Sequence, residues 1–369
     1  MSVGNSVEKP RFFIDLLNYQ YEIGNVGTIS AHNWTTGDKH PYTLGLSPTK
    51  AYESIAQVPA YDYQYFKIGF KSPISIPSAN MFIAVLGHNW AAKGYTFQIS
   101  FHIGGTSGSA WLEPDTFTSW SDTVFTDIVN SSCEYDGWSL ASFTPLETEN
   151  ISAIVLKISN ITDGNTFKLG GVAFGSIYEP QFHADLEVAQ SSIMDGVKNK
   201  QTKSGKTYSI INYTKPSNWW TGSPFELTDP NNTTLPLAFS NARIGRRVWD
   251  IGFSELSDRY YTDGSPNGVF PANNMAGNYL ADTVNGNYSS DEDYDSSTGD
   301  FHYNLNNDTS LYSTVYHHTL GGTLPFLFSP SSDNSPQNFA ICRFAKPGFK
   351  VNQKSYKKFS IKMRINESW

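Results

Sequence analysis

A two-residue alternation near the C-terminus constrains the fold of this chain more than any other feature of its sequence. Between residues 358 and 365, apolar and polar side chains take turns without a break. The apolar set is Phe359, Ile361, Met363 and Ile365, and the polar set is Lys358, Ser360, Lys362 and Arg364. Successive side chains of a β-strand point to opposite faces, so this pattern predicts a strand with one buried face and one face in water. Residues 246–253 alternate too, with Val248 or Trp249 marking a switch of face. Both runs predict strands of one antiparallel sheet system in the C-terminal half.

Composition extends this prediction to the whole chain. Aromatic residues make up 15% of the 369 residues and charged residues only 16%, and the chain contains 29 glycines and 19 prolines. Few long segments have the spacing of an amphipathic helix, and short apolar runs lie between residues typical of turns. We therefore predict an all-β fold. A chain of this length has room for two domains.

The N-terminal half contains a series of strand-like runs. Residues 95–101 alternate strictly, and further apolar runs occur at 79–89, 151–158 and 168–178. The apolar run at 11–19 is short for a helix and predicts a strand or edge segment. The order of the runs, one of which ends in Gly87-His88-Asn89, resembles galactose-binding-type jelly rolls. That resemblance implies a β-sandwich, in which two sheets pair and hide their strand edges.

A break at Glu179-Pro180 predicts the domain boundary, because a completed strand pattern gives way there to mixed polar sequence. We expect residues 1–180 to form an N-terminal arm followed by the jelly-roll sandwich. Residues 181–369 are expected to form an antiparallel β-barrel or β-sandwich, entered through a linker at 184–205. A polar stretch at 262–312 is expected to project from this second domain, since it has little apolar surface to bury.

Four segments of the C-terminal half resemble tail-completion or tail-tip proteins of long-tailed bacteriophages. They read RRVWDIGF at 246–253, GGTLPFLF at 321–328, NFAICRF at 338–344 and YKKFSIKMRI at 356–365. The resemblance implies a structural component of a tail tip, distal tail or baseplate, located in the virion and assembled in the host cytoplasm. Its expected partners are the tail tube, the hub, receptor-binding proteins and host surface glycan. Copies of the chain are expected to form a six-fold or three-fold ring, because aromatic-rich, charge-poor surfaces are typical of interface cores.

The sequence contains no enzyme motif. It lacks a Gly-x-Ser-x-Gly elbow, a His-Glu-x-x-His zinc motif, and a glycine loop with the lysine that phosphate binding needs. We therefore expect no catalytic activity, no cofactor and no catalytic metal. The two carboxylates of a glycosidase are distant in sequence, however, so a carbohydrate-binding adhesin or a tail-spike polysaccharide depolymerase stays open as the alternative function.

Three features resemble metal or disulfide sites only in part. The acidic run at 291–295 offers hard oxygen ligands but departs from the EF-hand pattern, so a calcium site and a solvated loop are both open. His317 and His318 would point to opposite faces of a strand, so we expect structural histidines and no shared metal. Cys133 and Cys342 are isolated thiols, and Cys342 lies in an apolar run that predicts a core position.

Tryptophans are the candidate contact residues. Trp219 and Trp220 are adjacent and could either stack on sugar rings or anchor a protein interface. Trp249 lies within the alternating run at 246–253 and is expected to anchor a core or an interface. The sequence does not decide between these alternatives.

The charge balance disfavours nucleic acid as a partner. The net charge is −8, whereas phosphate binding needs a basic patch. The basic cluster at 198–203 is the one feature that argues for nucleic-acid binding, and we expect it to be a solvated loop.

Residues 1–10 lack the apolar core of a signal peptide, and no run of 18 apolar residues predicts a transmembrane segment.

Overall fold

The computed structural model of the chain describes most of the segments that the sequence predicts as strands. It describes residues 9–31, 44–47, 52–53, 63–75, 80–103, 131–132, 135–143, 150–161, 168–180, 183–185, 189–193, 197–211, 246–257, 294–295, 300–301, 310–331, 338–348, 350–355 and 358–368.

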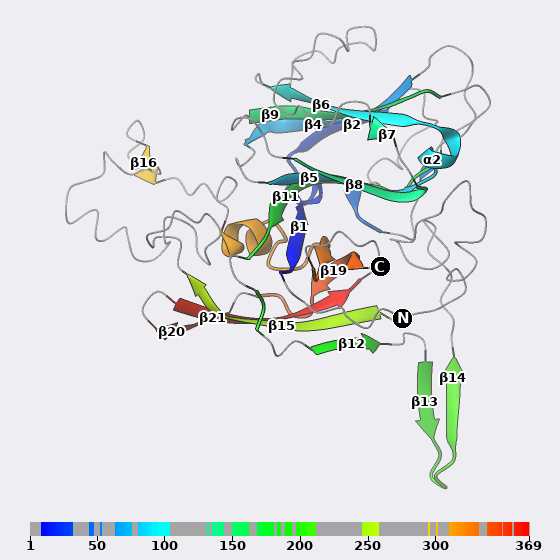
Figure 1. The fold of residues 1–369 in the computed structure, drawn as a ribbon, viewed down its shortest axis with the longest axis vertical. Coiled ribbons are helices and arrows are strands. Elements are labelled where there is room, and N and C mark those ends of the chain that lie inside the picture. The colour runs from blue at the N-terminus through cyan, green and yellow to red at the C-terminus, as the bar shows by residue number, and fades with distance from the viewer. Residues whose placement is uncertain are drawn as a thin grey trace, which may run out of the picture.

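Two antiparallel sheets dominate the fold (Figure 1). The ten-stranded sheet runs from edge to edge through β12 (Ala189–Ile193), β15 (Arg246–Ser257), β21 (Lys358–Glu367), β19 (Ala340–Phe344), β18 (Phe326–Ser329), β1 (Arg11–Asp15), β11 (Gly171–Tyr178), β5 (Met81–His88) and β8 (Gly137–Phe143), with β20 (Val351–Ser355) also paired to β21. The five-stranded sheet has the order β2 (Val26–Ala31), β4 (Tyr63–Ser75), β9 (Asn150–Ser159), β6 (Thr96–Ile103) and β7 (Ser131–Ser132). This architecture confirms the predicted all-β fold.

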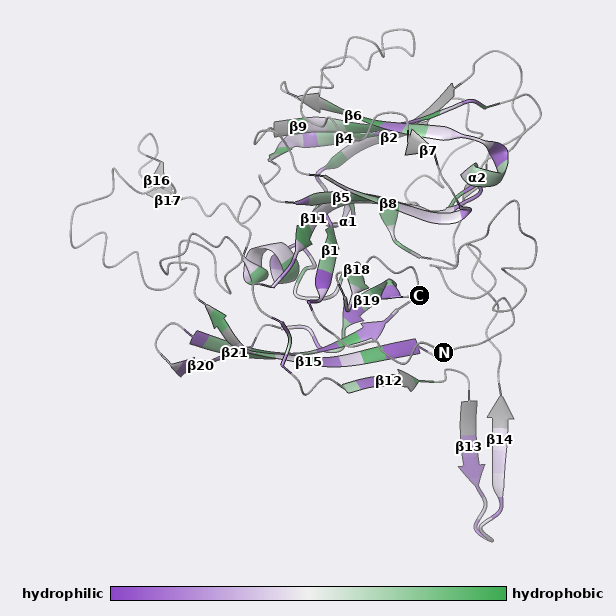
Figure 2. Ribbon diagram, in the orientation of Figure 1, coloured by the Kyte–Doolittle hydropathy of each residue, from purple (hydrophilic) through white to green (hydrophobic). Residues whose placement is uncertain are grey.

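Short elements complete the described chain. Three two-stranded sheets pair β3 (Tyr52–Glu53) with β10 (Lys168–Leu169), β13 (Val197–Gln201) with β14 (Thr207–Ile211), and β16 (Tyr294–Asp295) with β17 (Asp300–Phe301). The helices are α1 (Leu16–Glu22), α2 (Trp90–Lys93) and the π-helix η5 (Leu311–His317). In Figure 2 hydrophobic and hydrophilic residues are mixed along the strands of the two large sheets, whereas the coloured part of β13 is hydrophilic.

The N-terminal sandwich forms where the five-stranded sheet lies over β5, β8 and β11 of the larger sheet (Figure 1). Its core takes side chains from both sheets, among them Phe66 and Ile68 of β4 and Val85 of β5, each only 1% exposed. Phe101 of β6 and Phe174 of β11 meet between the sheets, with ring centroids 5.3 Å apart. The structure thus confirms the predicted β-sandwich.

Strand β1 joins the two halves of the chain. On one side it pairs with β11, where Phe12 lies opposite Tyr178, and on the other with β18, where Phe12 lies opposite Phe328. The expected edge segment at 11–19 is therefore a central strand followed by a helix. The predicted strand is confirmed for residues 11–15, but it is central and does not lie at an edge. The helix was not predicted, because every residue from 12 to 20 is buried and no polar face marks the period of the run.

The end of β1 makes a close backbone contact with β11. The strand stops at Asp15, whose Oδ1 accepts a hydrogen bond from Leu17 N at 3.0 Å and so caps α1. The same Oδ1 accepts a hydrogen bond from Phe174 N at 3.3 Å. Gly175 lies opposite Asp15, and a Cβ at Gly175 would overlap the carbonyl oxygen of Ile14. Only glycine allows the two backbones to approach this closely.

A third apolar cluster is shared by the two halves. It lies on the face of β5 that points away from the sandwich core. Its fully buried members are Phe13, Leu46, Phe82, Ala84, Leu86, Ala173, Leu327, Phe339 and Ile341. Because β5 and β11 come from the N-terminal half and β18 and β19 from the C-terminal half, this cluster packs both halves together.

The four segments that resemble phage tail proteins are neighbours in space. Strands β15, β21, β19 and β18 follow one another in the large sheet, which confirms the predicted antiparallel sheet system. In β21 the predicted faces hold for most positions: Ile361 and Ile365 are buried, while Lys362 and Arg364 are exposed. Ser360 departs from the prediction and is buried. Strand β20 flanks it, and the Ser360 hydroxyl donates to the carbonyl oxygen of Asn352 in β20 at 3.4 Å.

The π-helix η5 covers the inner face of the C-terminal sheet (Figure 1). Its Tyr316 stacks on Phe344 of β19 with ring centroids 4.9 Å apart. The helix is followed by Gly321 and Gly322, both with positive φ, and a Cβ at Gly322 would stand 2.7 Å from the Phe344 ring. The glycine pair therefore lets the chain turn tightly against the helix it follows.

Several predicted boundaries fall partly outside the described residues. Residues 184–205 are not a plain linker, because β12 and β13 lie within them. Of the polar stretch at 262–312, the structure describes only β16, β17 and residues 310–312, and Leu311 is buried at the start of η5. The domain division at residue 180 stays a prediction.

Candidate functional site

The predicted contact tryptophans are placed only in part. Trp219 and Trp220 lie outside the described residues. Trp249 is 1% exposed and packs against Phe328, with ring centroids 5.2 Å apart. The guanidinium of Arg247 lies 5.2 Å from the centroid of the Trp249 ring. Within the single chain Trp249 is thus a core residue, and its contact with a ligand or a second chain stays a prediction.

An ion pair fastens the C-terminal strand beside Trp249. Arg247 donates to both carboxylate oxygens of Glu367, from Nη2 at 2.9 Å and from Nε at 3.1 Å, and its backbone N–H donates to Oε2 at 2.8 Å. Glu367 is 5% exposed. The pair joins β15 to β21, and Arg247 also donates to the carbonyl oxygen of Phe339 at 2.6 Å. These contacts hold three neighbouring segments of the sheet together, which gives the pair a structural role.

The adjacent histidines lie at the end of a helix and not, as expected, on a strand. Both rings contact Tyr19 of α1, and the Tyr19 hydroxyl lies 2.9 Å from Nε2 of His317. Burial lowers the pKa of His318 to about 3, and it also lowers the pKa of His317. Within the described ranges no three His, Cys, Asp or Glu side chains gather in a way that could hold a metal ion. The structural role expected for this pair thus agrees with its packing.

The polar side chains of the Gly87-His88-Asn89 corner also contact other parts of the fold. The His88 ring stacks on Trp90 at 5.0 Å and its Nε2 lies 3.0 Å from the Ser139 hydroxyl. Asn89 Oδ1 accepts from the backbone of Lys168 at 2.8 Å. Burial lowers the pKa of His88 to about 3, so its imidazole is neutral at neutral pH. Through these contacts the polar groups hold the corner of the sandwich together.

Cys342 has no reactive environment. Its side chain is fully buried in β19, and burial raises the pKa of its thiol well above the usual range, with nearby Glu367 acting in the same direction. It therefore packs as a small apolar side chain, as predicted.

Cys133 and residues 291–293 lie outside the described residues. No helix in the described part of the chain is long and apolar enough to cross a membrane.

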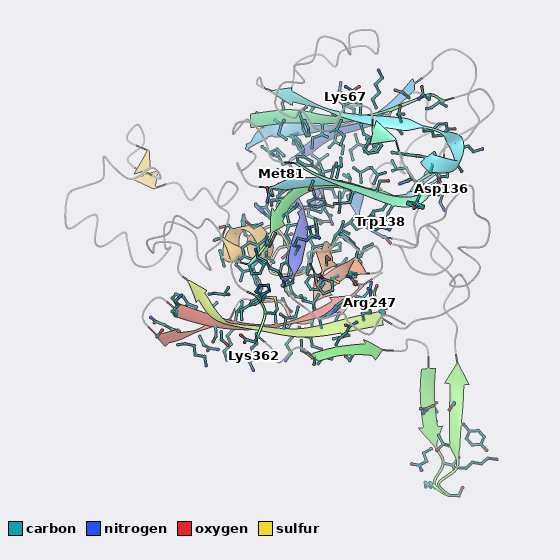
Figure 3. All side chains as sticks on the ribbon, in the orientation of Figure 1. Lys67, Met81, Asp136, Trp138, Arg247 and Lys362 are labelled. Atoms are coloured by element: carbon teal, nitrogen blue, oxygen red, sulfur yellow. The ribbon has the colours of Figure 1, made fainter. Side chains whose placement is uncertain are left out.

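A polar hollow lies on the outer surface of the C-terminal sheet, over β12, β15 and β21. It has a volume of about 330 Å³, and its charged side chains are Asp185, Asp250, Lys362 and Arg364. The alternation of the strands explains this lining: the side chains between these positions enter the core, so the charged ones face outward. Lys362, labelled in Figure 3, lies on the side of the sheet away from the sandwich.

Cross-strand register brings opposite charges together in the hollow. Asp250 of β15 lies opposite Arg364 of β21, with 3.8 Å between the carboxylate and Nε. Gly252 lies opposite Lys362. The side chains of Asp250 and Arg364 are 48% and 52% exposed, so a ligand in water can reach both.

Asp185 closes the hollow from a segment that precedes β12. Its N–H donates to the carbonyl oxygen of Gly252 at 2.8 Å, and its carboxylate accepts from Ser254 N at 3.0 Å and Ser254 Oγ at 2.7 Å. A Cβ at Gly252 would stand 2.9 Å from Asp185 Oδ2. A methyl group at this position would therefore push the carboxylate of Asp185 away from the strand.

The hollow offers acceptors and donors side by side on two rigid strands. Carboxylates accept hydrogen bonds, and the lysine and arginine side chains donate them. The sequence alone did not reveal this site, because Asp185 and Ser254 are 69 positions apart. The alternation at 358–365 placed Lys362 and Arg364 on one wet face, but no sequence signal paired them with the two aspartates.

Comparison with known proteins gives no family for the chain. No family model matches it, and no curated protein matches it. Solved structures with partial similarity include a selenomethionine-labelled mutant of chitosan-binding module 1 from a chitosanase/glucanase of Paenibacillus sp. IK-5, at 16% identity over 44% of this chain and 99% of that one, with a TM-score of 0.29. A pectin-binding carbohydrate-binding module matches at 12% identity over 41% and 91%, with a TM-score of 0.27. The CBM32-3 module of a family 31 glycoside hydrolase from Clostridium perfringens matches at 11% identity over 41% and 91%, with a TM-score of 0.26.

Proposed function

We propose that the protein is a carbohydrate-binding attachment protein without catalytic activity, and that the polar hollow contacts the sugar. The observation that carries the proposal is the hollow itself, which two carboxylates and two cationic side chains line over β15 and β21. The resemblance of the N-terminal half to galactose-binding-type jelly rolls supports the same class of function.

The chemistry of the hollow fits a neutral, hydroxyl-rich ligand. Each sugar hydroxyl both donates and accepts hydrogen bonds, so a site for sugar needs both kinds of group within a short distance. Asp250 and Arg364 supply them in direct cross-strand register. The two strands hold these side chains on rigid backbone, which lowers the entropy lost on binding.

Binding of the full-length protein to a glycan array tests the proposal. We expect binding to a defined set of glycans, weakened at least tenfold by Asp250→Ala. Gly252→Ala should have a similar effect, because its methyl group displaces the carboxylate of Asp185. Lys354→Ala is the matched control, since Lys354 is exposed on β20 outside the hollow. Absence of glycan binding, or equal binding by all variants, would contradict the proposal.

Release of reducing sugar ends separates a binding protein from a depolymerase. The proposal expects no release from any polysaccharide that the protein binds. In the hollow, the carboxylate of Asp185 is engaged by Ser254 and that of Asp250 faces Arg364. Polysaccharide cleavage that Asp185→Asn or Asp250→Asn abolishes would instead assign these two carboxylates a catalytic role.

A second candidate is a structural role at the tip of a bacteriophage tail. It is supported by the fact that the four segments carrying the resemblance form adjacent strands, β15, β21, β19 and β18. In this role the C-terminal sheet contacts other copies in a ring, and the tail tube, hub and receptor-binding proteins adjoin it. The two proposals are compatible, because a tail-tip protein can also contact host glycan. A reconstruction of the assembled particle tests this role, and a single copy or a location away from the tail would contradict it.

A further inference from the structure

The β13–β14 hairpin extends away from the rest of the molecule (Figures 1 and 3). Its two strands pair with each other and with no other described strand. All side chains from 199 to 209 are exposed. The side chains from 199 to 209 therefore add no apolar surface to the described cores, and packing does not explain why this part of the hairpin extends into solvent.

The tip of the hairpin is nevertheless well ordered by its own hydrogen bonds. Thr202 N donates to the carbonyl oxygen of Lys206 at 2.9 Å, and Lys206 N donates to Thr202 Oγ1 at 3.1 Å. Gly205 takes a φ of +83°, which the turn requires and glycine accepts without strain. On the strands, Ser209 Oγ donates to Asn199 Oδ1 at 2.8 Å. These hydrogen bonds define the backbone of the turn, and with it the positions from which the side chains extend.

The hairpin has the opposite charge to the rest of the chain. Residues 197–211 contain four lysines and no acidic residue, whereas the whole chain has a net charge of −8. The rest of the chain is therefore more acidic than the whole. The sequence predicted a solvated loop at 198–203; the segment is solvated, but its first part is a strand.

Lysines surround an exposed aromatic ring on one face of the hairpin. Tyr208 is 50% exposed and lies directly opposite Lys200 in the strand register. Lys206, two positions before Tyr208 on the same face, places its Nζ 5.2 Å from the centroid of the Tyr208 ring. Lys203 lies in the turn at the tip. The face thus combines one flat apolar surface with cationic groups on both sides.

We propose that this face binds an acidic polysaccharide, the tyrosine ring stacking on a sugar ring and the lysines pairing with its carboxylates or phosphates. A second copy of the chain fits less well, because lysine is depleted in protein interfaces and stable interfaces bury more than about 1,000 Å². Duplex nucleic acid also fits less well. It carries one charge per about 1.7 Å, which is a higher charge density than the few lysines around one tyrosine can neutralise.

This inference does not depend on the polar hollow, since it concerns a different element and a charged ligand. The test is binding of the full-length protein to immobilised polygalacturonate and to its uncharged methyl ester. We expect binding to the acid form only, weaker as salt is raised. The combined variant Lys200→Ala, Lys203→Ala, Lys206→Ala should weaken binding to the acid form about tenfold or more. It removes three exposed ion pairs between lysine and ligand, and each such pair contributes modestly. Tyr208→Ala should weaken it several-fold.

The matched control removes three exposed lysines elsewhere, by Lys346→Ala, Lys350→Ala and Lys354→Ala. Retained binding by this control, and by Asp250→Ala in the hollow, supports the proposal. Equal loss in both lysine triples would overturn it in favour of general charge attraction. Tighter binding to duplex DNA than to polygalacturonate would overturn it too. So would a change in the mass of the protein in solution caused by the hairpin triple, which would indicate a second copy as the partner.

Discussion

The two halves of the molecule bury their apolar surface in different ways. In the N-terminal half two sheets face each other, and aliphatic and aromatic side chains of both fill the space between them. In the C-terminal half one sheet is covered by η5 and by side chains of β1, and large aromatic rings such as Phe328 and Phe344 fill the core. The outer face of that sheet keeps exposed charged side chains and the polar hollow. In the sandwich the facing sides of both sheets are buried in the core, which stabilises the fold. The C-terminal sheet has an outer face that is available for contacts.

The halves are not independent, because they share strands and a core. Strand β1 pairs with both, and Phe13 packs against Phe82 of the N-terminal half and Phe339 of the C-terminal half. Whether residues 1–180 and 181–369 unfold separately depends on how much stability this shared cluster contributes.

Trp249→Ala is expected to have the largest effect. The side chain is 1% exposed, and truncation leaves a cavity among Phe328 and the strands around it, so the free energy of unfolding should fall by about 3–5 kcal/mol. Chemical denaturation followed by circular dichroism measures it. An unchanged midpoint would contradict the core position.

The same experiment sharpens the comparison of the halves. Two transitions, of which Trp249→Ala shifts only one, would support the boundary at residue 180. One transition that shifts as a whole would show that the shared sheet and the third cluster make the halves a single cooperative unit. Limited proteolysis gives an independent reading, with early cuts expected at 180–205 and 280–300 if the boundary holds.

The sequence predicted those elements whose two faces differ in polarity. In β21 the alternation was informative because one face lies in the core and the other in water. The prediction that Ser360 is exposed failed because β20 flanks this residue. At 11–19 a strand was predicted, but its central position and the helix that follows it were missed because every residue from 12 to 20 is buried. The π-helix was missed because nothing in residues 311–317 distinguishes it from a strand. The hollow was missed because its aspartates meet only after the sheet has formed.

Asp15→Asn is expected to change the pH dependence of stability. Asp15 lies at the seam of the two halves, and burial raises its pKa to about 8, against about 3.9 in an unfolded chain. The folded protein thus keeps a proton that the unfolded chain releases, so this contribution is present below about pH 4 and lost as the pH rises towards 8. The asparagine keeps the Oδ1 acceptor without the charge.

We therefore expect Asp15→Asn to match the original protein near pH 4 and to exceed it by on the order of 2–4 kcal/mol at pH 8. Urea denaturation at the two pH values measures this. Asp250→Asn serves as the control, because it makes the same substitution at a half-exposed aspartate away from the seam. Equal effects of Asp15→Asn at both pH values would show that the carboxyl is ionised in the folded protein.

Glu367→Gln tests the ion pair that joins β15 to β21. It leaves Arg247 without a charged partner, and because Arg247 is 21% exposed the cost should be about 2 kcal/mol, below that of a fully buried pair. Arg364→Gln removes one partner of the exposed pair with Asp250 and should cost less than about 0.5 kcal/mol. Thermal unfolding compares the two variants. A similar destabilisation by both would mean that burial of Glu367 does not strengthen its pair.

The smallest effect is expected from the hairpin. The combined variant Lys200→Ala, Lys203→Ala, Lys206→Ala removes side chains that are exposed to solvent, so the free energy of unfolding should change by less than about 0.5 kcal/mol. It also removes the cation–π pair of Lys206 with Tyr208, which lies within the hairpin and supports no core. Thermal unfolding of this variant and of Trp249→Ala compares the smallest expected loss of stability with the largest. A fall of several degrees for the lysine variant would mean that the hairpin packs against the body, and its exposed face would then need a structural explanation instead of a binding partner.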